Sequence, residues 1–397
     1  MRVRKQTKRG GSFAIGQDLD AGPGAGFAPR SGTLATRLPP ALLIFAILVV
    51  SVHPCTAQDP TELARAGTEA IEARRFGDAL DAFTRASSLR PGDASLCFGA
   101  GLAAFMLGKD DVAEAQFERA LVLKPELMPA AQWLGDLRYR AGRLQEAIAT
   151  VEEAQRRSPG ARQLQPQLND WRKELHLQNR FRDVPTEHFA ILYESAADDS
   201  LARSIGERLE VAYARIGKAL GVNPPDAITV VLYTREQFGD ITDLAAWSVA
   251  AYDGRIRLPL AGATASLEEL DRLLSHELVH AVVARLGGRT VPAWINEGLA
   301  TALEPQGTAE VEAHLTRAAA APALSKLHRS FVGLSTRNAE IAYASSARAV
   351  RRLLERHGAP ALVELLRDLG NGAAFDRAFY QRLAMRYDDF AALVARE

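Results

Sequence analysis

The sequence predicts a multidomain protein in which an all-α repeat solenoid is followed by an α+β domain. Residue types that recur every 34 positions between residues 60 and 162 predict a stack of similar helical units. Short β-branched and aromatic runs after Asp183 predict a small sheet, and the chain from Ser266 onward has a mostly helical composition. The 397 residues, 47% of them apolar and 24% charged, are enough for more than one folded core.

The charge balance argues against one class of partner. The 48 basic and 48 acidic residues give a formal net charge of zero. A nucleic-acid-binding domain usually carries an excess of basic residues on one face or in one run. Outside the extreme N-terminus the chain has no long run of one sign, so we expect no nucleic-acid partner.

Residues 1–57 have the features of a targeting segment, a signal peptide or an N-terminal anchor. Basic residues precede the apolar run Ala41–Val52, whose about 12 residues suit a signal-peptide core and fall short of the roughly 20 that span a bilayer. Cys55-Thr56-Ala57 then offers small residues to a signal peptidase. Export with cleavage, a retained anchor and no targeting role stay open. We expect an exported protein, periplasmic or membrane-anchored facing the periplasm, with membrane contact only through this anchor.

The segment 60–162 contains three copies of one pattern. Its columns are Gly67, Gly101 and Gly135; Ala79, Ala113 and Ala147; Ala86, Ala120 and Ala154; Pro91, Pro125 and Pro159; and Phe83, Phe117 and Val151. Small residues let two antiparallel helices approach closely, the large apolar residue fills the gap to the next unit, and proline ends the second helix. The pattern resembles tetratricopeptide repeats. The resemblance implies a solenoid whose concave face binds a protein partner, with residues 163–183 as a capping helix and linker.

Residues 184–397 carry the signals of the α+β domain. HFAILY (His188–Tyr193) and AITVVLY (Ala227–Tyr233) have the β-branched and aromatic composition of strands. Between them, Asp199–Leu220 has helical apolar spacing and ends before a glycine. A further strand is expected around the turn signal Asp253-Gly254, which the alternating run RIRLPL follows.

The stretch LLSHELVHAVV (Leu273–Val283) carries two histidines four residues apart. A capping-box signature that begins at Ser266 predicts one helix through this stretch. His276 and His280 therefore lie one turn apart on the same face, close enough to reach one metal ion. Glu277 is rotated by about 100° from His276, which places its carboxylate beside the ion, where a general base is needed.

A second helix, expected within Val291–Glu304, supplies a third ligand. Only a short glycine-containing connection separates it from the first helix, so it must fold back nearby. Glu297 in this helix can complete a His₂Glu zinc site and leave the fourth position for water. Gly298 costs about 1 kcal/mol of helix stability against alanine. Close approach of these two helices would explain the glycine.

The two helices together resemble a known family. The motif His276-Glu277-x-x-His280 followed by Trp294-Ile295-Asn296-Glu297-Gly298-Leu299-Ala300 is similar to the paired signatures of the peptidase MA-like domain, a branch of the gluzincin metallopeptidases. The resemblance runs from about residue 187 to the C-terminus. It implies a zincin-like fold, a Zn²⁺ held by His276, His280 and Glu297, and Glu277 as general base and proton shuttle.

Two further features are given by the same resemblance. Tyr343, in the stretch Ile341–Gly358, corresponds to the tyrosine that steadies the oxyanion in gluzincin aminopeptidases. The alternative is a tyrosine that only packs on its helix, with the hydroxyl at the surface. RIRLPL would be the edge strand that aligns an extended substrate.

We therefore expect an exported zinc metallopeptidase that hydrolyses peptide bonds in a peptide or protein substrate, with the repeats as a scaffold for protein recognition. The alternative is a non-catalytic interaction scaffold whose peptidase-like domain is inactive or vestigial. A zinc hydrolase acting on another amide or an ester also stays open. The sequence contains no identifiable anchor for a free amino terminus, so endopeptidase and aminopeptidase action are both left open.

Overall fold

The computed structural model describes residues 59–396, except for 160–161, 196–197, 224–227, 243–250, 260–265, 306–321, 330 and 332–333. The predicted leader, residues 1–57, lies outside the described residues, so export stays a prediction. Within the described part of the chain, no helix is both long enough and apolar enough to cross a bilayer. The residues from Ala57 onward form one compact unit.

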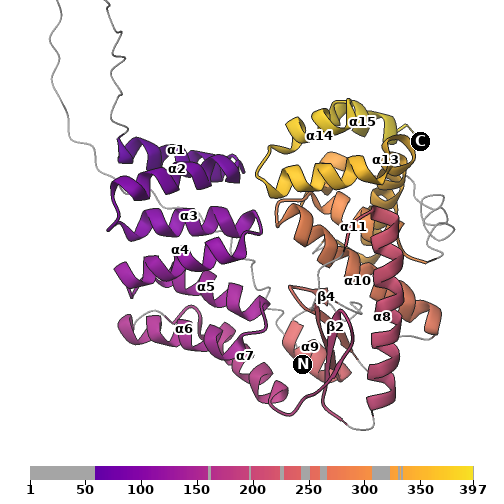
Figure 1. Ribbon diagram of the computed structural model, residues 1–397, viewed down its shortest axis with the longest axis horizontal. Coiled ribbons are helices and arrows are strands. Elements are labelled where there is room, and N and C mark those ends of the chain that lie inside the picture. Colours follow the sequence, from indigo (N-terminus) through magenta and orange to yellow (C-terminus); the bar gives the residue numbers. More distant parts are fainter. Residues whose placement is uncertain are drawn as a thin grey trace, which may run out of the picture. The chain divides into compact units, whose positions relative to one another are not determined.

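The predicted repeats are present as three helix pairs that stack in sequence order (Figure 1). The helices are α1 (Pro60–Glu72), α2 (Phe76–Leu89), α3 (Ala94–Met106), α4 (Asp110–Leu123), α5 (Met128–Arg140) and α6 (Leu144–Arg157). The first helices of the pairs begin 34 residues apart, which confirms the predicted period. The expected capping helix is α7 (Gln165–Gln178), where Trp171 stacks on Tyr139 of α5 with ring centroids 5.2 Å apart.

The recurring glycine and phenylalanine of the first two repeats have a packing reason. A Cβ atom added to Gly67 would lie 2.8 Å from the ring of Phe83, in the same repeat. A Cβ atom added to Gly99, in the next repeat, would lie 2.7 Å from the same ring. Phe117 occupies the equivalent position against Gly101. The phenylalanine therefore fills the space between successive helix pairs, as the sequence predicts.

The α+β part begins with a five-stranded sheet in the order β1-β2-β3-β5-β4. Its strands are β1 (Arg182–Pro185), β2 (Phe189–Tyr193), β3 (Ile228–Tyr233), β4 (Ala251–Tyr252) and β5 (Ile256–Pro259). β2, β3 and β5 are parallel, and β1 and β4 are antiparallel edge strands. The strands predicted by HFAILY and AITVVLY are therefore β2 and β3. The turn signal Asp253-Gly254 joins β4 to β5, as expected.

The run RIRLPL differs from its prediction. β5 is bonded to β3 on one side and to β4 on the other, so the expected edge strand is an inner strand. All four residues of β5 are buried, so the expected alternation of buried and exposed positions is also wrong. Arg255 and Arg257 are each 1% exposed, because both form ion pairs with Glu174 of α7. A buried ionic contact thus crosses the boundary proposed at residue 183.

Helices make up most of the remaining chain. They are α8 (Asp199–Leu220), α9 (Arg235–Thr242), α10 (Leu267–Gly287), α11 (Ala293–Ala302), the short 3-10 helix η2 (Leu324–Leu327), α13 (Thr336–Gly370), α14 (Phe375–Leu383) and α15 (Tyr387–Val394). α8 has the predicted bounds and ends at Gly221, whose φ of +66° favours glycine. α13 is broken at Gly358, two residues before Pro360. A single core joins the sheet to α8, α10, α11 and α13.

Candidate metal centre

The histidines lie on α10, which forms where the capping box predicts it. The side chain of Ser266 accepts a hydrogen bond of 3.2 Å from the backbone N–H of Glu269. Leu274, Leu278 and Val282 bury one face of the helix in the core. Because this face fixes the rotation of α10, the neighbouring face with His276 and His280 is held in one direction.

His276, His280 and Glu297 form the one His/Cys/Asp/Glu group in the described residues that is compact enough to hold a metal ion. Their candidate ligand atoms all lie within 4.8 Å of one another. The Oε2 atom of Glu297 lies 3.5 Å from Nε2 of His276 and 3.4 Å from Nε2 of His280. The three residues predicted as ligands on two separate helices are therefore brought together.

Two residues hold the imidazoles in orientation, and the sequence did not assign either of them a role. Nδ1 of His276 donates to Oε1 of Glu304 at 2.7 Å, and Nδ1 of His280 donates to Oδ1 of Asn296 at 3.0 Å. Each bond places a proton on Nδ1, so that in the neutral imidazole the lone pair is on Nε2, which faces Glu297. Glu304 follows Glu297 by seven residues, two helical turns, which is the sequence signal that could have identified it.

The carboxylates of Glu277, Glu297 and Glu304 surround the two imidazoles and affect their protonation. Burial alone would lower the pKa of His276, but Glu297 and Glu304 outweigh burial and raise that pKa to about 10. Burial opposes protonation of His280 as well, and the charge of Glu297 raises its pKa despite this. Burial would raise the pKa of Glu297, but the two imidazoles hold it well below its usual range. The cluster therefore favours positive charge at its centre.

Glu277 and Tyr343 lie beside this cluster. Glu277 is 5% exposed, and burial raises its pKa, as suits a carboxylate that accepts and returns a proton. Among the described residues its Oε2 atom has no hydrogen-bond partner. The ring of Tyr343, on α13, lies 6.2 Å from the ring of His276. Burial and then the charge of Glu297 raise the pKa of Tyr343, so its phenol keeps a proton to donate.

Gly298 allows a close helix contact, but with a different helix from the one predicted. A Cβ atom at this position would lie 2.7 Å from the carbonyl carbon of Ser346 and 2.8 Å from Cγ2 of Val350. Both residues belong to α13 and not to α10. The glycine thus brings α11, with Glu297, against the helix that carries Tyr343.

The residues present fit a zinc ion. Two imidazole nitrogens and one carboxylate are the donor set of many catalytic zinc sites, which keep a fourth position open. Both Nδ1 atoms are engaged by acceptors, so both Nε2 atoms are available as ligands. Oε2 of Glu297 is buried and has no hydrogen-bond partner among the described residues, as expected of an atom placed to bind a cation.

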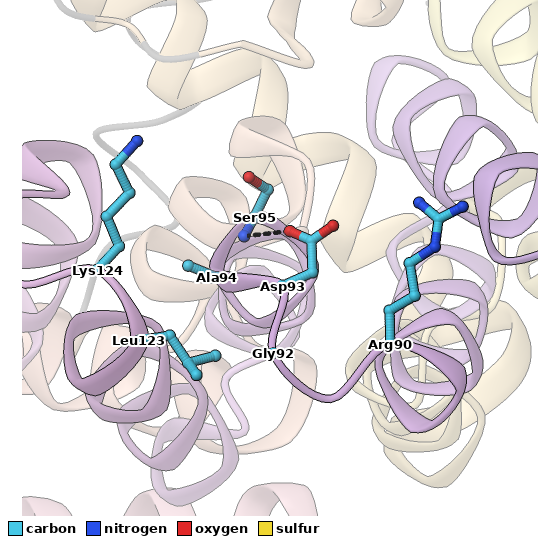
Figure 2. Close-up of a pocket in the computed structure, with 7 residues that line it drawn as sticks. All are labelled: Arg90, Gly92, Asp93, Ala94, Ser95, Leu123 and Lys124. Atoms are coloured by element: carbon cyan, nitrogen blue, oxygen red, sulfur yellow. Dashed lines mark hydrogen bonds between the residues drawn. The ribbon is translucent and has the colours of Figure 1, made fainter.

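A pocket between the first two repeats has different chemistry (Figure 2). Asp93 accepts a 2.9 Å hydrogen bond from the backbone N–H of Ser95 and caps α3. Arg90 donates to the hydroxyl of Thr61. The lining contains no histidine or cysteine, and its one carboxylate is used as a helix cap. The pocket therefore lacks the histidines and the free carboxylate of the metal centre.

Similar solved structures include repeat proteins. One is the first tetratricopeptide repeat domain of Spaghetti (RPAP3) bound to an HSP90 peptide, with 22% identity over 30% of this chain and 95% of that chain and a TM-score of 0.28. Another, a repeat protein from Bacteroides fragilis, is 13% identical over 82% of this chain and 99% of that chain, with a TM-score of 0.24. No curated protein matches the chain.

Family models match both parts of the chain. The model described as tetratricopeptide repeat matches residues 65–127 and 129–162, which cover most of the three helix pairs. The model described as Peptidase MA superfamily matches residues 210–389, which contain α10, α11 and the His-His-Glu group. The chain thus carries tetratricopeptide repeats followed by a domain of the Peptidase MA superfamily.

Proposed function

We propose that this protein is a zinc-dependent metallopeptidase of the gluzincin type, which hydrolyses peptide bonds in a peptide or protein substrate. The observation that carries the proposal is the convergence of His276, His280 and Glu297 from two helices, with Glu277 buried beside them. The Peptidase MA superfamily match supports the same class of reaction.

Each residue has one role in the proposed reaction. Nε2 of His276, Nε2 of His280 and the carboxylate of Glu297 would hold the zinc ion. When bound, zinc supplies Lewis acidity, which polarises a carbonyl and lowers the pKa of water. Glu277 takes a proton from the attacking water and later donates it to the leaving amine. Tyr343 donates its phenolic O–H to the negative charge that develops on the carbonyl oxygen.

The repeats supply protein recognition in this proposal. A stack of helix pairs presents a long surface built from equivalent positions, which suits an extended segment of a protein. Binding energy gained there, away from the scissile bond, would increase the rate on a protein substrate compared with a short peptide. We also propose that the leader exports the protein, which would place the reaction in the periplasm or at its membrane face.

The repeats also favour a second candidate, a non-catalytic interaction scaffold with an inactive peptidase-like domain. The two candidates differ in what they require of Glu277. A scaffold needs no carboxylate at this buried position, where an oxygen with no hydrogen-bond partner in the described part of the chain costs stability. A peptidase needs this carboxylate.

The test is a Glu277→Gln variant, with Glu268→Gln as its matched control. Glu268 is an exposed glutamate in the first turn of the same helix. Hydrolysis of unfolded casein and of a short quenched-fluorescence peptide would be measured together with zinc content. The proposal expects Glu277→Gln to lose at least about a hundredfold in rate and to keep its zinc, because Glu277 is not a ligand. Glu268→Gln should match the wild type.

Two outcomes would contradict this assignment. An equally active Glu277→Gln variant would show that another group is the base. A wild-type protein that binds zinc but cleaves neither substrate, while the repeats still bind protein, would favour the scaffold.

A further inference from the structure

The loop between α10 and α11 lies between the histidines and Glu297 in the chain. It runs from Gly288 to Pro292 and is the direct connection between the helix with both imidazoles and the helix with the carboxylate. A change in this loop would shift one helix against the other. The contacts that hold the loop are therefore the place to look for residues that position the three candidate ligands without touching them.

The second repeat holds this loop through Arg289. The backbone N–H of Arg289 donates to the carbonyl oxygen of Met106 at 3.0 Å. Its guanidinium donates to both carboxylate oxygens of Asp110, at 2.6 and 3.0 Å, and to the carbonyl oxygen of Phe105 at 2.7 Å. The same guanidinium lies 4.0 Å from the centre of the Phe105 ring. An arginine that forms a bidentate ion pair and also stacks on an aromatic ring is held in a specific geometry.

The neighbouring glycine makes the approach still closer. Gly288 has a φ of +63°, and a Cβ atom there would lie 2.5 Å from the carbonyl group of Leu107. Leu107 and Gly108 form the turn between the two helices of the second repeat. The backbone of the loop therefore packs directly against the backbone of the repeat, and no side chain fits between them at residue 288.

The equivalent turns of the other two repeats contact the peptidase domain as well. Gly77, just after the turn in the first repeat, lies against the backbone of Gly372, which follows α13. Arg140, at the turn in the third repeat, donates to the carbonyl oxygen of Asp253 in the β4–β5 turn. Each of the three repeats thus contacts the peptidase domain at or next to its turn, so one edge of the repeat array is docked along its length.

We propose that the second repeat is a positioning element of the metal centre, and that Arg289, clamped to Asp110, is its positioning residue. The inference rests on the proposed zinc site. Repeat two fixes the α10–α11 loop, and the loop fixes Glu297 relative to His276 and His280. The repeats are then part of the catalytic unit as well as a recognition surface.

The test uses the full chain and the zinc dissociation constant, measured by competition with a chromophoric chelator. Arg289→Ala and Asp110→Asn should each weaken zinc binding about tenfold, the lower end of the effect of residues that support metal ligands. Because both changes break one contact, the double variant should be no weaker than the more affected single variant. Arg289→Lys, which keeps the charge and the backbone bond, should fall between Arg289→Ala and the wild type.

Arg382→Ala is the matched control. Arg382 makes an equally short bidentate pair with Asp368, at 2.6 and 2.8 Å, but this pair joins α14 to α13. Its zinc affinity should equal that of the wild type. The melting temperature of each zinc-free variant, measured alongside, separates lost stability from a displaced site.

Three results would overturn the inference. One is a wild-type zinc affinity in both Arg289→Ala and Asp110→Asn, whatever their melting temperatures. Another is an equal loss of affinity in Arg382→Ala, which would indicate general destabilisation. A wild-type protein that binds no zinc would overturn the proposed function first, and the inference with it. If Arg289→Ala does not fold, Asp110→Asn decides alone, because Asp110 is a half-exposed side chain on the surface of the repeat.

Discussion

Replacing Gly298 by alanine tests whether the contact between α11 and α13 limits the geometry of the metal centre. Two effects of opposite sign compete at this residue. Alanine in a helix is favoured over glycine by about 1 kcal/mol. The added Cβ atom, however, would lie 2.7 Å from the carbonyl carbon of Ser346 and 2.8 Å from Cγ2 of Val350. Real Cβ atoms essentially never approach another heavy atom to less than 3.0 Å, so α11 and α13 must separate.

The cost of the steric clash should exceed the gain in helix propensity. Overpacking a core typically costs about 1–3 kcal/mol, and a contact with backbone lies at the upper end because backbone cannot change rotamer. Subtracting the gain in propensity leaves an expected loss of about 2 kcal/mol in the free energy of unfolding. Since Glu297 precedes Gly298 directly, the same movement displaces the carboxylate, and zinc affinity should fall as well.

Urea denaturation of the zinc-free protein measures the first effect, with Gly239→Ala as the control. Gly239 is a helical glycine of α9, and among the described residues beyond its own stretch of helix no atom lies within 4 Å of its added Cβ, so we expect only the propensity gain. Gly239→Ala should therefore be stabilised by up to about 1 kcal/mol. The reasoning is refuted if Gly298→Ala is as stable as the wild type, or gains stability as the control does.

Two further substitutions test other parts of the structure. Glu304→Ala removes the acceptor that orients His276, so zinc affinity should fall about 10- to 100-fold in a chelator competition; an unchanged affinity would show that the hydrogen bond is dispensable. Glu174→Ala removes the carboxylate partner of buried Arg255 and leaves buried Arg257 with Asp253 alone, so it should cost about 3–5 kcal/mol in urea denaturation. The exposed pair of Glu152 with an arginine of α7 is the comparison, since Glu152→Ala should cost at most about 1 kcal/mol. An equal loss of unfolding free energy in Glu174→Ala and Glu152→Ala would contradict the claim that burial makes the Glu174 ion pairs the more costly to break.

Local signals in the sequence were enough to predict most helices and the arrangement of the repeats. The repeat period depends on the contact of Phe83 with glycines close by in the chain, so it leaves a regular pattern. The start of α10 at Ser266 and the end of α8 at Gly221 depend on caps within three residues. Three of the site residues share two helices joined by a short loop, so helical spacing alone predicted that they would meet.

Contacts between distant parts of the chain could not be predicted in this way. Arg257 pairs with nearby Asp253, but it is buried against Glu174, 83 residues earlier, and an arginine in an alternating strand otherwise indicates an exposed face. The carboxylate on Asp110 that clamps Arg289 is 179 residues away. Neither pair leaves a pattern in its own neighbourhood. The prediction that Gly298 packs against α10 was wrong for the same reason. A glycine in a helix indicates a close contact but does not identify the helix that makes it.

The account depends most directly on zinc at the His-His-Glu group. The decisive measurement is the zinc content of the full-length protein, determined by mass spectrometry of the metal. The wild type, His280→Ala and His357→Ala are each stripped with chelator, reconstituted with zinc and freed of excess metal before the measurement. We expect one zinc per chain in the wild type and in His357→Ala, whose histidine lies outside the group, and well below one in His280→Ala. A wild-type protein with far less than one equivalent, or a His280→Ala variant that retains a full equivalent, would contradict the proposed metal centre.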